Sequence, residues 1–362
     1  MRRGLLVAVV TACALAPRAD AKFGIIKTKL TLPRVRPPEA PLLAETVAVE
    51  VRAGGAEITQ DFLAIVRGQV EDALRSASVY QLVDRGREAD AVVRVRLETI
   101  HAEVRDEIRM ETRSVKVGER EEWDDKKKKT VYKDVYADRD VPVTWRVVDG
   151  SLSASVEVDG PEGPHTSDAG GSYHDQFKTE DKMPPEATDE SSLKRFLVQR
   201  AADRTVALVA FAPDPVEVLL AVNGELKDGN RYAEAGLWDQ ALESWGRKTY
   251  KGDTEAARLH NVGVGHEALA YRLPPYAAEH RGHLEQARDL YKQAQALDPD
   301  EKYFRDPPLR AEVSLQYAAS ASLFLSELQQ YRDAKAAKRG PSRRDDEGAK
   351  ARPAHRQTSG RP

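Results

Sequence analysis

Four histidines raise the question of a metal centre. His260 and His266 lie six residues apart, and His280 and His283 flank Arg281 at the edge of an apparent insertion. Imidazole nitrogens are common zinc ligands, but the His-Glu-x-x-His spacing of zinc hydrolases does not occur in the sequence. We therefore expect these histidines to be solvent-exposed or capping residues, and we expect no metal site.

Two short motifs also have a spacing that could support chemistry. Ser191 and Lys194 form a Ser-x-x-Lys pair, a spacing at which some serine enzymes carry their nucleophile, but the companion Ser-Asp-Asn and Lys-Thr-Gly motifs are missing from the sequence. Ser191 is better explained as a helix cap. Gly54 and Gly55 follow a predicted strand, where backbone amides can hold an anion, but no Gly-Lys-Ser/Thr follows them, so we expect a plain turn.

Residues 159–190 are rich in Gly, Pro, Asp and Ser, which predicts a long loop. Catalytic groups are often on loops, and this segment contains His165, Asp168, His174 and Asp175. No nucleophile stands in a recognisable frame beside them. A hydrolase with its site in this loop is therefore the alternative hypothesis, and our expectation is a protein without catalytic residues or cofactors.

A run of four lysines at 126–129 lies near Trp123, Tyr132 and Tyr136. Lysines can contact phosphates and aromatic rings can stack on bases, so this combination can indicate nucleic-acid binding. Six acids between 119 and 134 oppose that interpretation, and the whole chain has 56 basic and 59 acidic residues, for a net charge of −3. We expect a hairpin tip in water and no nucleic-acid partner.

Residues 1–21 have the pattern of an export signal, with a basic start, an apolar run and small residues before Ala21. Cleavage after Ala21 would place the mature chain in the periplasm or at the outer membrane, without any cysteine. Cys13 is the only cysteine, and its Val-Thr-Ala-Cys context resembles a bacterial lipobox. Lipidation at Cys13, which would tether the protein to a membrane, is the alternative, and an uncleaved anchor is the third.

The elements that follow predict an α+β domain at 46–212. A proline-rich stretch at 22–45 is expected to be an extended arm. The order then is a strand at 46–51, a helix at 58–77 with one apolar face, and strands at 79–85 and 90–97. This order suits a small sheet with a helix packed on one face.

The sheet is predicted to continue into a long β-hairpin extension with a charged tip at 119–129. Residues 101–117 alternate loosely, and the alternating runs at 141–147 and 152–158 are separated by Asp149 and Gly150, a hairpin signal. Residues 191–212 return to a helical pattern that could cover the sheet, and prolines then mark a domain boundary.

The region 216–335 is predicted to be entirely helical, and it resembles the tetratricopeptide-repeat (TPR) family. The resemblance is carried by Gly229, Tyr232, Gly236, Ala241 and Trp245 in one unit, and by Ala287, Tyr291, Ala294 and Pro299 in a second. Small residues let paired helices approach closely, and the aromatic residue of the second helix fills the space beside them. Lys248 and the insertion at 272–282 depart from the pattern.

A helix at 309–332 is expected to cap this array, and the basic tail at 336–362 is expected to be disordered. The N-terminal domain is weakly similar to compact domains of bacterial envelope lipoproteins of the curli-secretion and penicillin-binding-protein-activator type. That similarity implies an envelope setting and no particular activity.

The resemblance to TPR proteins implies a shallow groove that binds a protein or peptide. We therefore expect a non-catalytic scaffold of the bacterial cell envelope, with a hydrolase of envelope polymers, or a subunit of a secretion or pore assembly, as alternatives. First-helix residues usually face the groove, whereas ordinary packing is the competing explanation for each of them. The predicted groove residues are Tyr232, Trp238, Asn261, Glu267 and Tyr271.

Overall fold

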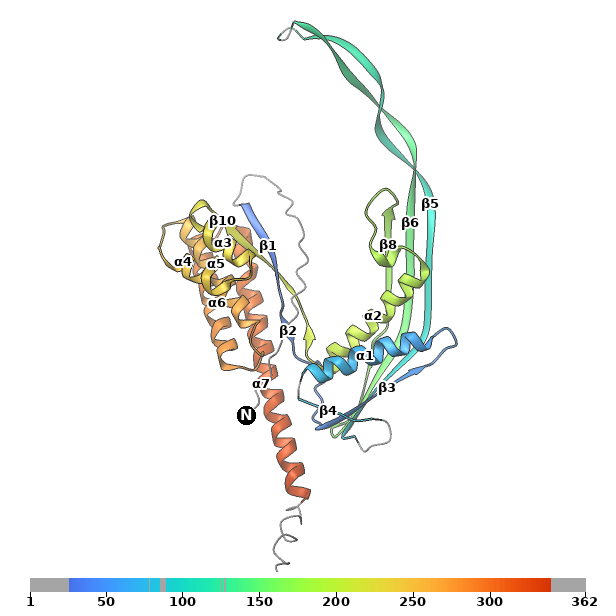
Figure 1. Ribbon diagram of the computed structural model, residues 1–362, viewed down its shortest axis with the longest axis vertical. Helices are drawn as coiled ribbons and strands as arrows, with labels where there is room; N and C mark the ends of the chain where they lie inside the picture. The colour runs from blue at the N-terminus through green and yellow to red at the C-terminus, as the bar shows by residue number, and fades with distance from the viewer. Residues whose placement is uncertain (1–25, 78, 85–88, 125, 127, 340–362) are drawn as a thin grey trace, which may run out of the picture. The chain divides into compact units, whose positions relative to one another are not determined.

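The computed structural model describes residues 26–77, 79–84, 89–124, 126 and 128–339 (Figure 1). The predicted signal at 1–21 with Cys13, and most of the predicted tail, lie outside these residues. The chain divides into two compact units. The helical unit comprises the described parts of Met1–Pro37 and Ala212–Ser326, and the sheet unit comprises those of Pro38–Phe211 and Glu327–Pro362.

The sheet unit contains a mixed sheet with the strand order β4-β3-β5-β6-β7, and β8 also pairs with β6. Its β3 is parallel to β4 and β5, whereas β6 is antiparallel to β5, β7 and β8. The strands are β3 (Thr46–Ala53), β4 (Gln81–Leu82), β5 (Ala91–Asp124), β6 (Lys129–Gly160), β7 (Gly163–Asp168) and β8 (Gly171–Lys178). The predicted α+β class is confirmed.

Two helices, α1 (Gln60–Ser76) and α2 (Glu190–Val209), pack against each other and against this sheet (Figure 1). A short 3₁₀ helix, Pro185–Ala187, precedes α2. Each helix begins at a side-chain cap, because Thr59 accepts a hydrogen bond from the Phe62 amide and Asp189 accepts one from the Ser192 amide. The prediction that Ser191 is the cap was therefore wrong, since Ser191 lies inside the first turn of α2.

The long hairpin extension is confirmed. β5 has 34 residues and β6 has 32, and they remain paired from Val92 opposite Asp159 to Asp124 opposite Lys129. Beyond the rest of the sheet the two strands continue as a twisted two-stranded ribbon, which we call the arm (Figure 1). A register shift between Lys116 and Gly118 marks a bulge in β5.

Two sequence-based predictions in this unit were wrong. Asp149 and Gly150 form no turn, since they pair in mid-strand with Glu103 and Ala102. Gly150 lies close against α2, because a Cβ there would lie 3.0 Å from Leu197 Cδ1, which is tighter than ordinary van der Waals contact. The expected loop at 159–190 instead contains β7 and β8, and its glycines lie at or beside the ends of these strands.

The helical unit contains five helices and two short antiparallel strand pairs. The helices are α3 (Lys227–Glu234), α4 (Trp238–Gly246), α5 (Asp253–Ala270), α6 (Ala278–Leu297) and α7 (Asp306–Arg339), with 3₁₀ turns at Gly224–Leu226 and Lys302–Phe304. The strand pairs are β1 (Ile26–Leu32) with β10 (Val216–Val222), and β2 (Val35–Arg36) with β9 (Ala212–Pro213). The region from 216 onward is thus not entirely helical. The proline-rich segment at 22–45, which was predicted to be extended, includes the paired strands β1 and β2. α7 contributes to this unit up to Ser326 and to the sheet unit from Glu327.

The helix pairs approach each other through glycine against an aromatic ring. A Cβ on Gly229 of α3 would lie 2.2 Å from Trp245 Nε1 on α4, and one on Gly263 of α5 would lie 2.7 Å from Tyr291 Cε1 on α6. The residues that the TPR resemblance assigned to packing are all buried here: Gly229, Ala241, Trp245, Ala287, Tyr291 and Ala294. Within the described ranges, no helix combines the length and apolar character needed to cross a bilayer.

Candidate functional site

Four of the five predicted groove residues lie inside the helical unit. Trp238, Asn261, Glu267 and Tyr271 are buried, and only Tyr232 is exposed, at 39% of its surface. The prediction that these four side chains face a partner was wrong, because each is covered by other parts of this chain.

Asn261 holds the chain's own strand β10. Its Oδ1 accepts a hydrogen bond from the Ala221 amide at 2.8 Å, and its Nδ2 donates to the Ala221 carbonyl at 2.9 Å. Asn230 of α3 donates to the same carbonyl at 2.9 Å and accepts a hydrogen bond from Trp245 Nε1 at 3.2 Å. The first helices of both pairs therefore bind a peptide segment, and that segment is internal.

Glu267 lies at the centre of a second buried network. Arg310 of α7 donates to both carboxylate oxygens at 2.8 Å, Tyr271 donates to Oε1 at 2.7 Å, and Tyr291 donates to Oε2 at 2.6 Å. Burial alone would raise the pKa of Glu267, but the ion pair with Arg310 and the two tyrosine hydroxyls hold it below its usual range. A carboxylate that stays ionised and fully bonded is a structural tie between α5, α6 and α7.

The histidines also have internal roles. His260 and His280 are both buried. The expectation of an exposed or capping side chain was wrong for His260, which contacts a strand carbonyl, whereas His280 contacts the carbonyl of the last residue of α5 and so caps that helix. His260 Nε2 contacts the Leu219 carbonyl at 2.7 Å, and His280 Nδ1 contacts the Ala270 carbonyl at 2.8 Å. His266 and His283 stack, with their Nδ1 atoms 3.0 Å apart. In the part of the chain that the structure describes, no group of three or more His, Cys, Asp or Glu side chains could hold a metal ion.

The residues of the hydrolase alternative lie on strands and have separate partners. His174 is 3.7 Å from Asp149, Asp168 accepts a hydrogen bond from the Gly170 amide at 2.8 Å, and Asp175 accepts one from the Gln176 amide at 2.8 Å. These contacts fix each side chain locally and do not assemble a nucleophile with a base.

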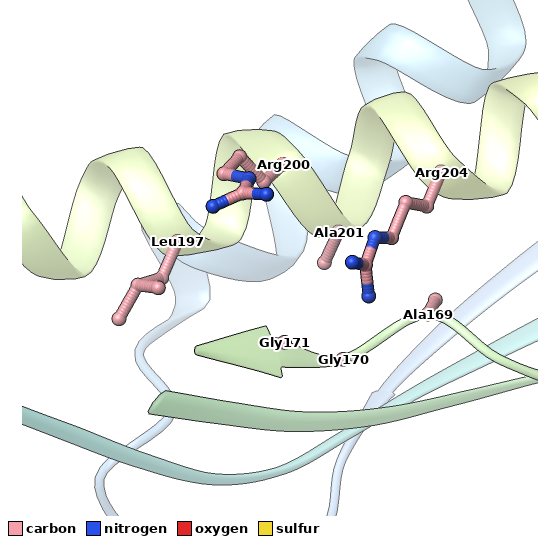
Figure 2. A pocket seen from close by; sticks show the side chains of 7 residues that line it. All are labelled: Ala169, Gly170, Gly171, Leu197, Arg200, Ala201 and Arg204. Atoms are coloured by element: carbon pink, nitrogen blue, oxygen red, sulfur yellow. The ribbon is translucent and has the colours of Figure 1, made fainter. Parts of the chain in front are cut away.

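A small pocket lies between α2 and the turn from β7 to β8 (Figure 2). Arg204 extends from α2 toward Gly171, and Arg200 Nη1 is 3.5 Å from the Ser172 carbonyl. Ala169, Leu197 and Ala201 complete the lining. Two guanidinium groups can attract a small anion, but the lining has no side chain that could act as a nucleophile or a general base.

The tip of the arm has the most prominent exposed aromatic surface that the described side chains form. Trp123, Tyr132 and Tyr136 are 59%, 64% and 57% exposed. Strand pairing places them on one face, because Tyr132 is opposite Glu121, two residues before Trp123, and Tyr136 is four residues after Tyr132. We call these three residues the tip aromatics. Sequence reasoning noticed them beside the lysine run but did not assign them a shared face.

Two tyrosine hydroxyls of this face are held by acids. Tyr132 donates to Glu121 Oε1 at 2.9 Å, and Tyr136 donates to Asp134 Oδ2 at 3.3 Å. Both hydroxyls therefore have a hydrogen-bond partner although the rings are exposed to solvent. Comparison with models of known protein families gives no match, and comparison with curated proteins gives none either.

Proposed function

We propose that this protein is a non-catalytic scaffold of the bacterial cell envelope that binds a protein partner through the tip aromatics of its arm. The single observation that carries the proposal is three large aromatic side chains, each more than half exposed, on one face of a two-stranded ribbon. Aromatic residues are enriched in protein interfaces, because their rings bury large apolar areas while a polar atom still bonds. Grouped exposed apolar side chains mark interaction sites more often than single ones do.

We place the contact with the partner on the arm and not in a groove of the helical array. Asn261 holds β10, and Glu267 and Tyr271 hold α7. An external peptide would therefore have to displace Ala221 from its three hydrogen bonds to Asn261 and Asn230. Tyr232 is the one predicted groove residue that a partner could reach. A crosslinker at Tyr232 therefore compares the surface of the helical unit directly with the tip aromatics.

Site-specific photo-crosslinking in the native envelope tests the proposal. A photoreactive residue at Trp123 should give one discrete adduct, and the same residue at Arg120 should not, because Arg120 is also more than half exposed but faces the opposite side of the ribbon. Tyr132→Ser should abolish the adduct formed from position 123. An adduct from position 232 but not from 123 would return the contact to the helical array, and adducts from neither position would contradict a scaffold role for both surfaces.

A further inference from the structure

Among the residues that the structure describes, the outer edge of β5 has no neighbouring strand along most of its length. β3 pairs with β5 only as far as Leu97, whereas β5 continues to Asp124. In the residues that the structure describes, no other strand lies on that side of β5. An edge of this length presents a row of backbone donors and acceptors that can pair with another strand unless side chains prevent it.

One face of this edge has a strict alternation of charge, which we call the charge ladder. Its members occupy every second position and are Glu103, Arg105, Glu107, Arg109, Glu111 and Arg113. Neighbours on the same strand bond to each other: Arg105 contacts Glu103 at 2.7 Å and Glu107 at 3.1 Å, and Arg109 contacts Glu107 at 2.6 Å. The ladder side chains are between 23% and 48% exposed, and Glu111 and Arg113 also contact Lys178 and Glu180 of the same chain.

This pattern is complementary to itself in one antiparallel register. If two β5 edges meet around a two-fold axis at residue 108, Glu103 lies opposite Arg113, Arg105 opposite Glu111, and Glu107 opposite Arg109. All six ladder residues of each copy then face an opposite charge. An axis at residue 107 or 109 would place like charges opposite each other throughout, so the ladder also disfavours the neighbouring registers.

Two other axes keep part of this complementarity. An axis at residue 106 or at residue 110 pairs only four of the six ladder residues, and an axis at 106 also sets Asp106 against its own copy. The axis at 108 instead brings together two copies of Ile108, whose side chain is 74% exposed on the face opposite the ladder. Charge pairing on one face and apolar contact on the other therefore favour the same register.

We propose that a second copy of this chain pairs antiparallel with the β5 edge between Glu103 and Arg113, with Ile108 on the two-fold axis. The pairing would extend the sheet from one copy into the other. Such an interface is isologous and closes after two copies. It would pair the backbone donors and acceptors of both β5 edges in this segment without continuing into a fibre. The paired segment ends well before Trp123, so the tip aromatics remain free, and this inference stands or fails separately from the proposed function.

Disulfide crosslinking tests the register directly. Directly opposite residues in an antiparallel pair have Cα atoms about 4.5–5.5 Å apart, a separation that a disulfide bridges. In a Cys13→Ser background, Ile108→Cys should form a covalent dimer on mild oxidation. Asp106→Cys and Met110→Cys should each give at least ten-fold less, because their copies would be four residues out of register, about 13 Å apart. A highest yield at 106 or 110 would overturn this register, and no dimer at any of the three positions would overturn the pairing.

Charge exchange tests the role of the ladder in solution. Glu107→Arg alone and Arg109→Glu alone should each weaken the dimer at least ten-fold in sedimentation experiments, because each creates two like-charge contacts across the axis. The double variant Glu107→Arg with Arg109→Glu should recover dimerisation, since every cross-axis pair is again opposite in sign. Trp123→Ala should dimerise like the unaltered protein. A protein that stays monomeric at about 100 μM, or a single variant that dimerises normally, would contradict the proposal.

Discussion

At the scale of single residues, the Glu267–Arg310 pair is the most deeply buried ion pair of the described residues, because the Glu267 carboxylate is fully removed from water and the Arg310 side chain is only 17% exposed. Replacing Glu267 with Gln would leave the Arg310 guanidinium buried without its counterion. Breaking a buried pair costs about 3–5 kcal/mol, so we expect a loss of that order in the free energy of unfolding of the helical unit, measured with urea. Glu243→Gln is the matched control, since its ion pair with Arg247 is exposed and should contribute about 0–1 kcal/mol. Equal losses for the two variants would contradict a structural role for the buried pair.

His266, which is half-buried, and His280, which is buried, predict a dependence of stability on pH. Burial lowers the pKa of His266, with a further contribution from His283, and burial also lowers the pKa of His280 below the ordinary value of 6.5. The unfolded chain therefore binds more protons than the folded chain as the pH falls through about 6.5, and the free energy of unfolding should decrease between pH 7.5 and 5.5. Denaturant titrations at the two pH values measure this, and His266→Gln should reduce the difference. A free energy of unfolding that rises on acidification over this range would disprove the assignment. The depressed pKa of Glu267 acts at more acidic pH, below its ordinary value of 4.5.

At the scale of elements, close helix pairing depends on Gly229. Gly229→Ala would place a methyl group 2.2 Å from Trp245 Nε1, and this contact requires α3 and α4 to separate. We expect a loss of about 1–3 kcal/mol or more in the free energy of unfolding of the helical unit. Gly282→Ala is the control, because Gly282 lies inside α6 with open space around its Cα, and alanine there should stabilise the unit by about 0.5–1 kcal/mol. Thermal unfolding of both variants measures these effects. If the two unfolding temperatures shifted in the same direction, the explanation of Gly229 would be wrong.

Periodicity predicted the helices and the long hairpin, because those signals are local. It misplaced elements where composition resembles that of a turn. Asp149 and Gly150 are typical hairpin residues, but here they lie in mid-strand, and Gly150 packs closely against Leu197 of α2. β10 was missed because strand pairing with β1 is a long-range contact that local patterns do not encode. The groove residues were misassigned for the same reason, since nothing near Asn261 in sequence indicates that Ala221 lies against it. The alternation of Glu and Arg from 103 to 113 could be read from the sequence, but only the structure shows that its edge is open.

At the scale of the whole molecule, each unit is completed by segments that are far apart in the chain. In the sheet unit, Lys335 near the end of α7 forms ion pairs with Asp90 and Glu45, and Asp90 also accepts hydrogen bonds from the Glu45 and Thr46 amides. Burial would raise the pKa of Asp90, but the hydrogen bond from Lys335 and those from the two amides lower it. The last turns of α7 therefore secure the start of β3.

Lys335→Met should weaken that attachment, because it removes the cation and leaves Asp90 partly buried. We expect a loss of about 1–3 kcal/mol in the free energy of unfolding of the sheet unit, together with faster hydrogen exchange at the Glu45 and Thr46 amides. Lys338→Met, an exposed change in the following turn of the same helix, should leave both measurements unchanged. Unaltered exchange in Lys335→Met would show that α7 is dispensable for the start of β3.

The pairing of β1 with β10 has a consequence for biosynthesis. Leu32, which is buried in the finished protein, has its partner, Val216, 184 residues later in the chain. At translation rates of about 5–20 residues per second, β1 would emerge from the ribosome roughly 10–40 s before β10. During that interval its apolar side chains have nothing to cover them, which makes this segment the natural place for a chaperone to act on the nascent polypeptide.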